Sequence, residues 1–176
     1  MSKQLVRKFK WWWTWQDGMH EQWLQQQARA GLHLRSSDPL GVFMTFERGE
    51  PAEMAYRWDY PGLKDRQYAQ LFADAGWEQA AEVAGWCCWR KPVLNGKAPE
   101  IFTDNASKVL KYQRSLGLLL ACSLPLLMMA VLPGPRAALL TEPRAAGVAM
   151  FALVLLGFGV AGLGRRIFQL RGGVRA

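Results

Sequence analysis

The chain has 176 residues, 51% of them hydrophobic, and a formal net charge of +8, which raises the question of a nucleic-acid partner. Residues 1–115 hold 16 Lys and Arg against 13 Asp and Glu, whereas residues 116–176 hold six Arg against one acid. Because most of the excess flanks apolar runs, we interpret it as charge at a membrane edge and expect no nucleic-acid partner.

The first predicted element is a strand within KFKWWWTW, Lys8 to Trp15. Alternation predicts that one of its faces carries Phe9, Trp11, Trp13 and Trp15. The opposite face then carries Lys8, Lys10, Trp12 and Thr14. We assign the first row to a core beneath helices, although nine tryptophans in one chain exceed what a small core holds. Some aromatic rings are therefore expected on an open sheet face, as a platform for a ligand or a partner protein.

Helices and further strands follow in alternation. DGMHEQWLQQQARAG predicts a helix that ends at Gly31, and LHL begins the next strand. VFMTFERGEP and AEMAYRWDYP read as a hairpin around a Gly-Glu-Pro turn. KDRQYAQLFADAG predicts a second helix that ends at Gly76, and WEQAAEVAGWCCWRKP supplies one or two more strands.

The two halves of this region resemble each other at an offset of 45 residues, which places Gly31 on Gly76 and Trp23 on Tyr68. A strand, helix, strand unit used twice predicts an α+β fold of the ferredoxin-like kind. In such a fold one antiparallel sheet carries both helices on one face.

Two uncharged runs lie in the C-terminal third, and both are long enough for helices that cross a bilayer. Gly157 and Ala161 form a ridge of small residues for close helix contact, within the pair or in a homo-oligomer. The predicted boundaries are a cytosolic α+β domain 1–100, a juxtamembrane helix and linker 101–115, transmembrane helices 116–132 and 145–164, an external loop 133–144 and a basic cytoplasmic tail 165–176.

Basic residues are distributed unevenly around these runs. Seven lie close to the outer ends of the runs, three before the first and four after the second, whereas the loop between them holds only Arg136 and Arg144. The positive-inside rule therefore predicts that both termini are cytoplasmic. The residues expected to meet lipid headgroups, rather than form an ordinary solvated helix face, are Lys108, Lys111, Arg114, Arg165 and Arg166.

No catalytic motif is visible along the chain. Cys87 and Cys88 are adjacent and Cys122 is isolated, which gives neither a disulfide framework nor a metal-binding spacing. His20 and His33 are far from any nucleophile motif, and such histidines are most often surface or capping residues. We therefore expect no catalytic residues, no metal and no cofactor, in a reducing, cytoplasmic setting.

The candidate binding residues lie in YRWDY. If its aromatic residues face the helices, Arg57 and Asp59 share the open sheet face and would bind a polar or charged ligand beside tryptophan rings. The alternative is a cross-strand ion pair that contributes little. Trp12, Trp86 and Arg90 are added to this predicted ligand site.

Several separated segments carry a family resemblance: EQWLQQQARAGLHL, FERGEPAEMAYRWDY, LFADAGWE, GWCCWRKP and TDNASK. They resemble the domain-of-unknown-function family numbered 2812, over about Lys8 to Tyr112. The resemblance implies a multi-pass protein of the bacterial inner membrane, with a soluble domain followed by membrane helices, and it transfers no catalytic residues.

Together these features predict a membrane-anchored, cytoplasm-facing binding or regulatory module. Its Trp-rich sheet face would recognise a small ligand or a partner protein. The alternative is a membrane-associated enzyme or a transporter accessory subunit.

Overall fold

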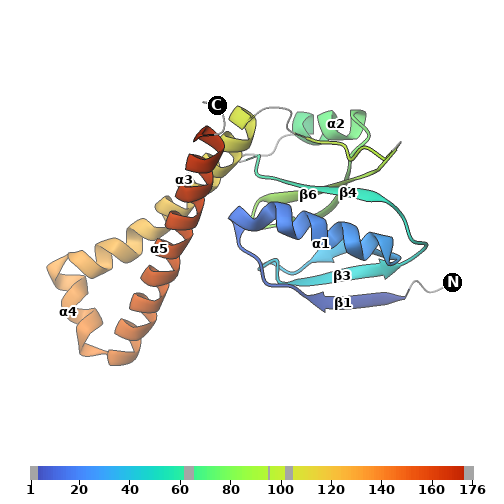
Figure 1. The fold of residues 1–176 in the computed structure, drawn as a ribbon. Coiled ribbons are helices and arrows are strands. Elements are labelled where there is room, and N and C mark those ends of the chain that lie inside the picture. Colours follow the sequence, from blue (N-terminus) through green and yellow to red (C-terminus); the bar gives the residue numbers. More distant parts are fainter. Residues whose placement is uncertain (1–3, 62–65, 95, 102–104, 173–176) are drawn as a thin grey trace. The chain divides into compact units, whose positions relative to one another are not determined.

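A computed structural model describes residues 4–61, 66–94, 96–101 and 105–172 (Figure 1). The chain divides into two compact units, Met1–Ser107 and Lys108–Ala176. We call the first unit the α+β domain and the second the helical unit, and each is described by itself.

The α+β domain contains two three-stranded antiparallel sheets. The first sheet has the order β1-β3-β2, from β1 (Leu5–Phe9), β2 (Leu32–Ser37) and β3 (Phe43–Arg48). The second sheet has the order β4-β6-β5, from β4 (Met54–Asp59), β5 (Glu78–Val83) and β6 (Trp86–Pro92). Helices α1 (Asp17–Arg29) and α2 (Arg66–Asp74) follow the first strand of each sheet. The domain is therefore built from two β-α-β-β repeats.

Helix α1 lies between the two sheets, whereas α2 covers the other face of the second sheet (Figure 1). From α1, His20 contacts Trp58 of β4, and Trp23 contacts Phe46 of β3. On the far side, Phe72 of α2 stacks on Trp89 of β6 with 4.2 Å between ring centroids. The α+β class is confirmed. The predicted single ferredoxin-like sheet with both helices on one face is not, because the strands form two sheets.

Helices on both sides leave β4 and most of β6 buried on both faces, whereas the edge strand β5 is partly exposed. Each residue of the run from Trp86 to Trp89 is at most 4% exposed. Cys87 and Trp89 pack in the cluster beside α2, whereas Trp58 faces His20 of α1. Near-continuous apolar strands are typical of sheets covered on both faces.

The hairpin predicted between VFMTFERGEP and AEMAYRWDYP is wrong. Strand β3 pairs with β1 and β2, and β4 pairs with β6, so the connection crosses from one sheet to the other. Its backbone is bonded to the end of α1: the Gly49 N–H donates to Gly31 O, and the Ala52 N–H donates to Ala28 O. Gly31 has φ +76°, and a Cβ there would lie 2.6 Å from Gly49 O, so this close approach requires glycine.

The strand predicted through Trp15 is also wrong, because β1 ends at Phe9. Just beyond the strand, the Trp12 indole donates to Gly41 O at 2.8 Å, which ties the chain to the loop before β3. The Gln16 N–H then donates to Trp13 O at 2.7 Å and closes a 3₁₀ turn over Thr14–Gln16. Side chains in this turn do not alternate between two faces, so the predicted row of aromatic residues is broken.

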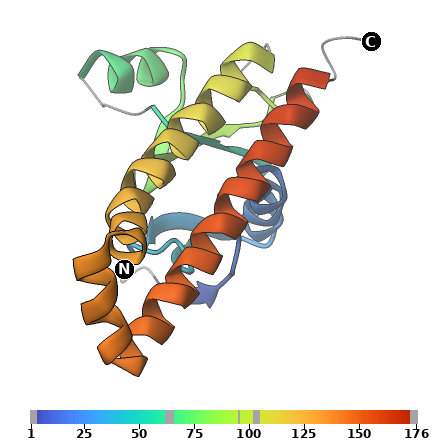
Figure 2. The same cartoon turned by 90° about the vertical axis from the view of Figure 1, so that its left-hand side faces the viewer.

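The helical unit consists of α3 (Asn105–Val131, which starts within the α+β domain), α4 (Pro133–Thr141) and α5 (Pro143–Gly172). Helices α3 and α5 run side by side and are joined by α4 (Figures 1 and 2). Ala106–Val131 and Pro143–Gly172 are both long and apolar enough to cross a membrane. Helix α3 is continuous across the predicted boundary at 115, and the predicted loop 133–144 contains α4.

The two long helices approach each other closely at a glycine. A Cβ on Gly159 would lie 3.0 Å from the Leu119 side chain, so the lack of a side chain permits this contact. Among the described residues, no atom lies within 4 Å of the corresponding position on Gly157. The contact within the pair therefore uses Gly159, and the predicted ridge of Gly157 and Ala161 is exposed.

Candidate functional site: a polar groove between two sheets

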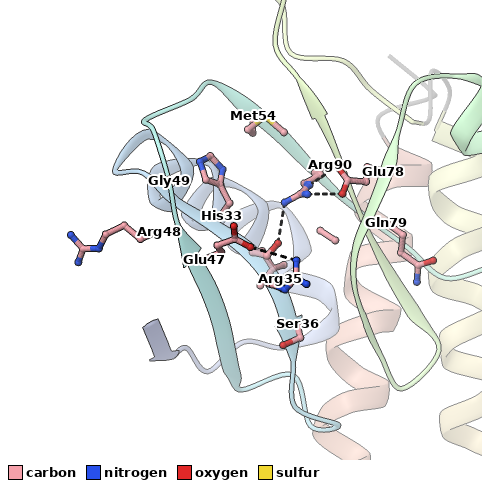
Figure 3. A pocket seen from close by; sticks show the side chains of 12 residues that line it. His33, Arg35, Ser36, Glu47, Arg48, Gly49, Met54, Glu78, Gln79 and Arg90 are labelled. Atoms are coloured by element: carbon pink, nitrogen blue, oxygen red, sulfur yellow. Dashed lines mark hydrogen bonds and ion pairs between the residues drawn. The ribbon is translucent and has the colours of Figure 1, made fainter. Parts of the chain in front are cut away.

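A groove of about 910 Å³ opens in the α+β domain where the edge strand β2 lies beside the edge strand β5 (Figure 3). All four strands β2, β3, β5 and β6 contribute to its walls, together with Met54 of β4. Its polar lining includes His33, Arg35, Glu47, Glu78, Gln79 and Arg90.

Irregular pairing in both edge strands helps to keep this groove open. The pairing of β2 with β3 shifts register between Leu34 and Ser36, and that of β5 with β6 shifts between Gln79 and Ala81. A bulge twists an edge strand and disfavours the addition of another strand. Arg35 and Ala80, the residues at the two shifts, both line the groove.

Arg90 connects the two sides of the groove. Its Nε and Nη2 donate to the Glu78 carboxylate at 3.0 and 2.6 Å, and its Nη1 donates to Leu34 O at 3.2 Å. The hydrogen bonds with Glu78 raise the pKa of Arg90, and those from Arg90 lower the pKa of Glu78. Arg90 thus links the two sheets through hydrogen bonds, and it also lines the groove.

Arg35 offers a more accessible cation in the same groove. Its side chain is 64% exposed, and its Nη1 lies 3.4 Å from Glu47 Oε2, a longer contact than that between Arg90 and Glu78. The neighbouring His33 Nε2 is 2.8 Å from Glu50 O. Arg48 also lines the groove, although its guanidinium is directed outward (Figure 3). Arg35 is therefore the guanidinium best placed to meet a ligand.

Arg57, predicted on an open face, is instead 9% exposed. Its Nε and Nη2 donate to the Glu100 carboxylate at 3.1 and 2.6 Å, and its Nη1 lies 3.6 Å from Glu21 Oε2. Glu21 Oε1 also accepts the Trp58 N–H at 2.8 Å, at the free edge of β4. Arg57 thus fixes the chain at Glu100 to the second sheet.

Asp59 is 5% exposed, and it too departs from the predicted open face. It accepts the Tyr60 N–H and the Tyr68 hydroxyl, both at 2.7 Å, and the Trp89 indole donates to the Tyr68 oxygen at 3.1 Å. Burial and the hydrogen bond to Asp59 raise the pKa of Tyr68, which keeps its hydroxyl a donor. This hydrogen-bonded chain ties β4, α2 and β6 together.

Trp12 and Trp86 also lie away from the groove lining. The Trp12 ring stacks on His20 with 4.4 Å between centroids, and the Trp58 indole donates to His20 Nδ1 at 2.9 Å. His20, which the sequence suggested was a surface or capping residue, is 1% exposed. Burial, with a smaller effect of Lys10, lowers its pKa to about 3. Trp86 is 4% exposed and packs against Tyr60.

Of the five predicted ligand-site residues, only Arg90 lines the groove. Sequence reasoning missed Arg35, Glu47, Glu78 and Gln79. Each of these residues is a charged or amide side chain within a strand, which was the signal available in the sequence. No local pattern, however, shows that β2 and β5 lie side by side.

Cys88 is fully buried, and burial raises the pKa of its thiol, so it is a poor nucleophile. The parts of the chain that the structure describes contain no group of three or more His, Cys, Asp or Glu placed to hold a metal ion. The groove instead presents guanidinium donors beside carboxylate acceptors.

The predicted headgroup residues occupy one end of the α3 and α5 pair. Lys111 Nζ lies 4.9 Å from the Tyr112 ring centroid, and Arg166 Cζ lies 6.0 Å from the same centroid. Lys111 is 6% exposed. Arg114 and Arg165 are exposed and Lys108 is half-buried. Arg175, which also entered the charge count, lies outside the described residues.

Comparison with known proteins identifies a family. A family model described as "Protein of unknown function (DUF2812)" matches residues 16–124, from the turn before α1 into α3. No curated protein and no solved structure matches the chain. Since the match covers more than half of the sequence, the chain belongs to the DUF2812 family.

Proposed function

We propose that the protein is a membrane-anchored binding module that holds a small polar or charged ligand in the groove between β2 and β5. The groove replaces the Trp-rich face as the proposed ligand site, because Trp58, Trp86 and Trp89 are all at most 4% exposed. Regulation would follow if the bound state altered how the α+β domain meets a partner at the membrane.

The observation that carries this proposal is the pairing of an exposed guanidinium with carboxylates in a groove of about 910 Å³. A carboxylate or phosphate group on a ligand would compete with Glu47 for Arg35 and form a charge-assisted hydrogen bond. Glu47 would then accept from a ligand amine or hydroxyl. The chemistry therefore favours a small anionic or zwitterionic molecule over an apolar one.

The test is a thermal-shift screen of the full-length protein in detergent against anionic and zwitterionic metabolites. A ligand at 100 times its Kd stabilises the native state by about 2.7 kcal/mol. For a ligand found in this way, Arg35→Gln should weaken binding about tenfold or more. Arg29→Gln is the matched control, because Arg29 is similarly exposed and ion-paired with Glu53 but is not among the groove's lining residues. Equal weakening by both variants, or none by Arg35→Gln, would reject the groove as the binding site.

We further propose that α3 and α5 anchor this module in the bacterial inner membrane, with both termini in the cytoplasm. A helix of 27 residues and one of 30 residues are about 40 and 45 Å long at 1.5 Å per residue, which exceeds the roughly 30 Å of a hydrocarbon core. The excess of Lys and Arg before α3 and at the end of α5 supports this orientation.

Reporter fusions test the orientation. A reporter that is active only in the cytoplasm should work at the C-terminus and fail when inserted after Thr141, at the end of α4. Activity at Thr141 together with silence at the C-terminus would reverse the orientation. Activity at every position, with release of the protein by alkaline carbonate, would reject membrane anchoring itself.

A further inference from the structure

Aromatic residues with exposed rings lie on the outer face of the first sheet and in the chain just after β1. We call them the aromatic patch, in which Trp13 and Trp15 are half-buried: Phe9, Trp11, Trp13, Trp15 and Phe43. Phe9 and Trp11 are 60% and 57% exposed, and Phe43 is 39% exposed. Phe9 packs on Phe43 at 5.3 Å between centroids, Trp11 on Trp13 at 5.4 Å and Trp13 on Trp15 at 5.1 Å. Exposed apolar groups gathered in this way mark an interaction surface.

The strand pairing explains why this face remains open. Phe9 lies opposite Phe43 in the β1 and β3 pair. On the other face of β1, Lys8 Nζ donates to the Gln27 side chain of α1 at 2.6 Å, so α1 covers that side. Leu5, Arg7 and Phe9 alternate with the residues that face α1, and all three are exposed.

Positive charge accompanies the aromatic patch. The Arg7 guanidinium lies 4.3 Å from the Phe43 ring centroid, and Arg7 is exposed. The nearby Asp38 carboxylate is turned to the backbone, where it accepts the N–H groups of Val42 and Phe43 at 2.8 Å each. Exposed aromatic rings near an arginine match the interfacial layer of a bilayer, where amphipathic rings and anionic headgroups meet.

The chain connection favours a bilayer over a protein as the occupant. Glu100 is ion-paired with Arg57, and Ile101 packs against the cluster beside α2. Helix α3 begins at Asn105, so only three residues separate this anchored point from the first apolar helix. If α3 crosses a membrane, this short connection holds the α+β domain close to the membrane surface, at a high effective concentration.

We propose that the aromatic patch docks into the headgroup layer of the membrane that α3 and α5 anchor, with Arg7 beside anionic lipid. The inference rests on the proposed anchoring, and it adds a second, peripheral membrane contact made by the α+β domain. The rings of Trp11 and Phe9 enter the interfacial layer, and the bulk of the domain stays in water.

The distribution of tryptophan makes this contact measurable in the intact protein. All nine tryptophans lie between residues 11 and 89, so none belongs to α3, α4 or α5. The full-length protein is reconstituted in vesicles of phosphatidylethanolamine and phosphatidylglycerol that contain lipid brominated near the headgroup. Quenching of tryptophan fluorescence by this lipid then reports only on the α+β domain.

We expect the quenched fraction to fall at least twofold in the double variant Trp11→Ala, Trp13→Ala. The matched control is Trp77→Phe, a change in the cluster beside α2, where the side chain is 7% exposed. The quenched fraction of this control should equal that of the parent protein. Arg7→Glu should reduce quenching in vesicles with phosphatidylglycerol more than in vesicles of phosphatidylcholine alone.

The outcomes separate this inference from the anchoring on which it rests. Release by alkaline carbonate means that the anchoring has failed. Retention in the membrane with equal quenching in the double variant and the parent protein overturns docking by the patch. Retention without lipid quenching, together with Trp11-dependent crosslinking between chains, would show that a second copy covers the patch and also overturns the inference.

Discussion

The aromatic residues around His20 and those of the aromatic patch come from overlapping stretches of sequence but lie in opposite environments. Trp12 stacks on the buried His20, whereas its neighbour Trp11 is 57% exposed. On the inner side, Trp58 is 1% exposed and donates a hydrogen bond to the same histidine. Residue type therefore does not decide which aromatic side chains of KFKWWWTW are buried. The path of the backbone after β1 decides it.

The largest expected effect lies in the interior group. Trp58→Ala should destabilise the α+β domain by about 3 to 5 kcal/mol, because it leaves a cavity between β4 and α1 and removes the donor to His20. Urea unfolding of the full-length protein in detergent, followed by circular dichroism, measures this change. A loss below about 1 kcal/mol would mean that this region is not the core.

Tyr68→Phe should have the next largest effect. It removes the hydroxyl that donates to the buried Asp59 carboxylate and accepts from Trp89. Loss of a buried hydrogen bond to a charged group should cost about 1.5 to 3 kcal/mol. Comparison with Asp59→Asn and with the double variant checks the assignment, since independent effects of the two changes would contradict a direct contact.

A smaller effect is expected in the pH dependence of stability, and it arises from His20. Its pKa is lowered from 6.5 to about 3 in the folded protein, so the unfolded chain binds the extra proton first as the pH falls. Stability should therefore be highest above pH 6.5 and decline between 6.5 and about 3, by at most about 1.4 kcal/mol per pH unit from this group.

The pH dependence of urea unfolding tests the role of His20. His20→Phe should flatten this decline, because it removes the buried imidazole. Equal slopes in the parent protein and in His20→Phe would show that another group causes the decline.

The smallest effect is expected in the aromatic patch. Trp11→Ala should change the unfolding free energy by less than about 0.5 kcal/mol, as is usual for exposed positions. The same urea titrations measure it. A loss comparable to that of Trp58→Ala would erase the distinction between the two groups of aromatic residues.

Local patterns were sufficient for most elements of the α+β domain. Gly31 and Gly76 end α1 and α2 with φ +76° each, as their positions in the sequence predicted. The repeated unit is real in outline, since Trp23 of α1 contacts Phe46 of β3 just as Tyr68 of α2 contacts Trp89 of β6. Apolar length likewise located the two long helices.

Strand partners and faces were beyond those patterns. The Gly-Glu-Pro turn looks like a hairpin, but hydrogen bonds from the connection to Gly31 and Ala28 direct β4 into another sheet. The consecutive apolar residues from Trp86 to Trp89 were a local sign of burial on both faces. The prediction that Arg57 and Asp59 lie on an open face did not take this sign of burial into account. The groove beside β5 depends on two edge strands that meet only in the folded domain.

Residue-resolved hydroxyl-radical footprinting tests the division of the aromatic residues most directly. The full-length protein in detergent is oxidised briefly, and mass spectrometry reports the rate at each tryptophan. The structure predicts fast oxidation of Trp11, which is 57% exposed, and strong protection of Trp58 and Trp89, which are 1% and 3% exposed. Oxidation of Trp58 or Trp89 as fast as that of Trp11 would contradict the separation into an interior group and an exposed patch.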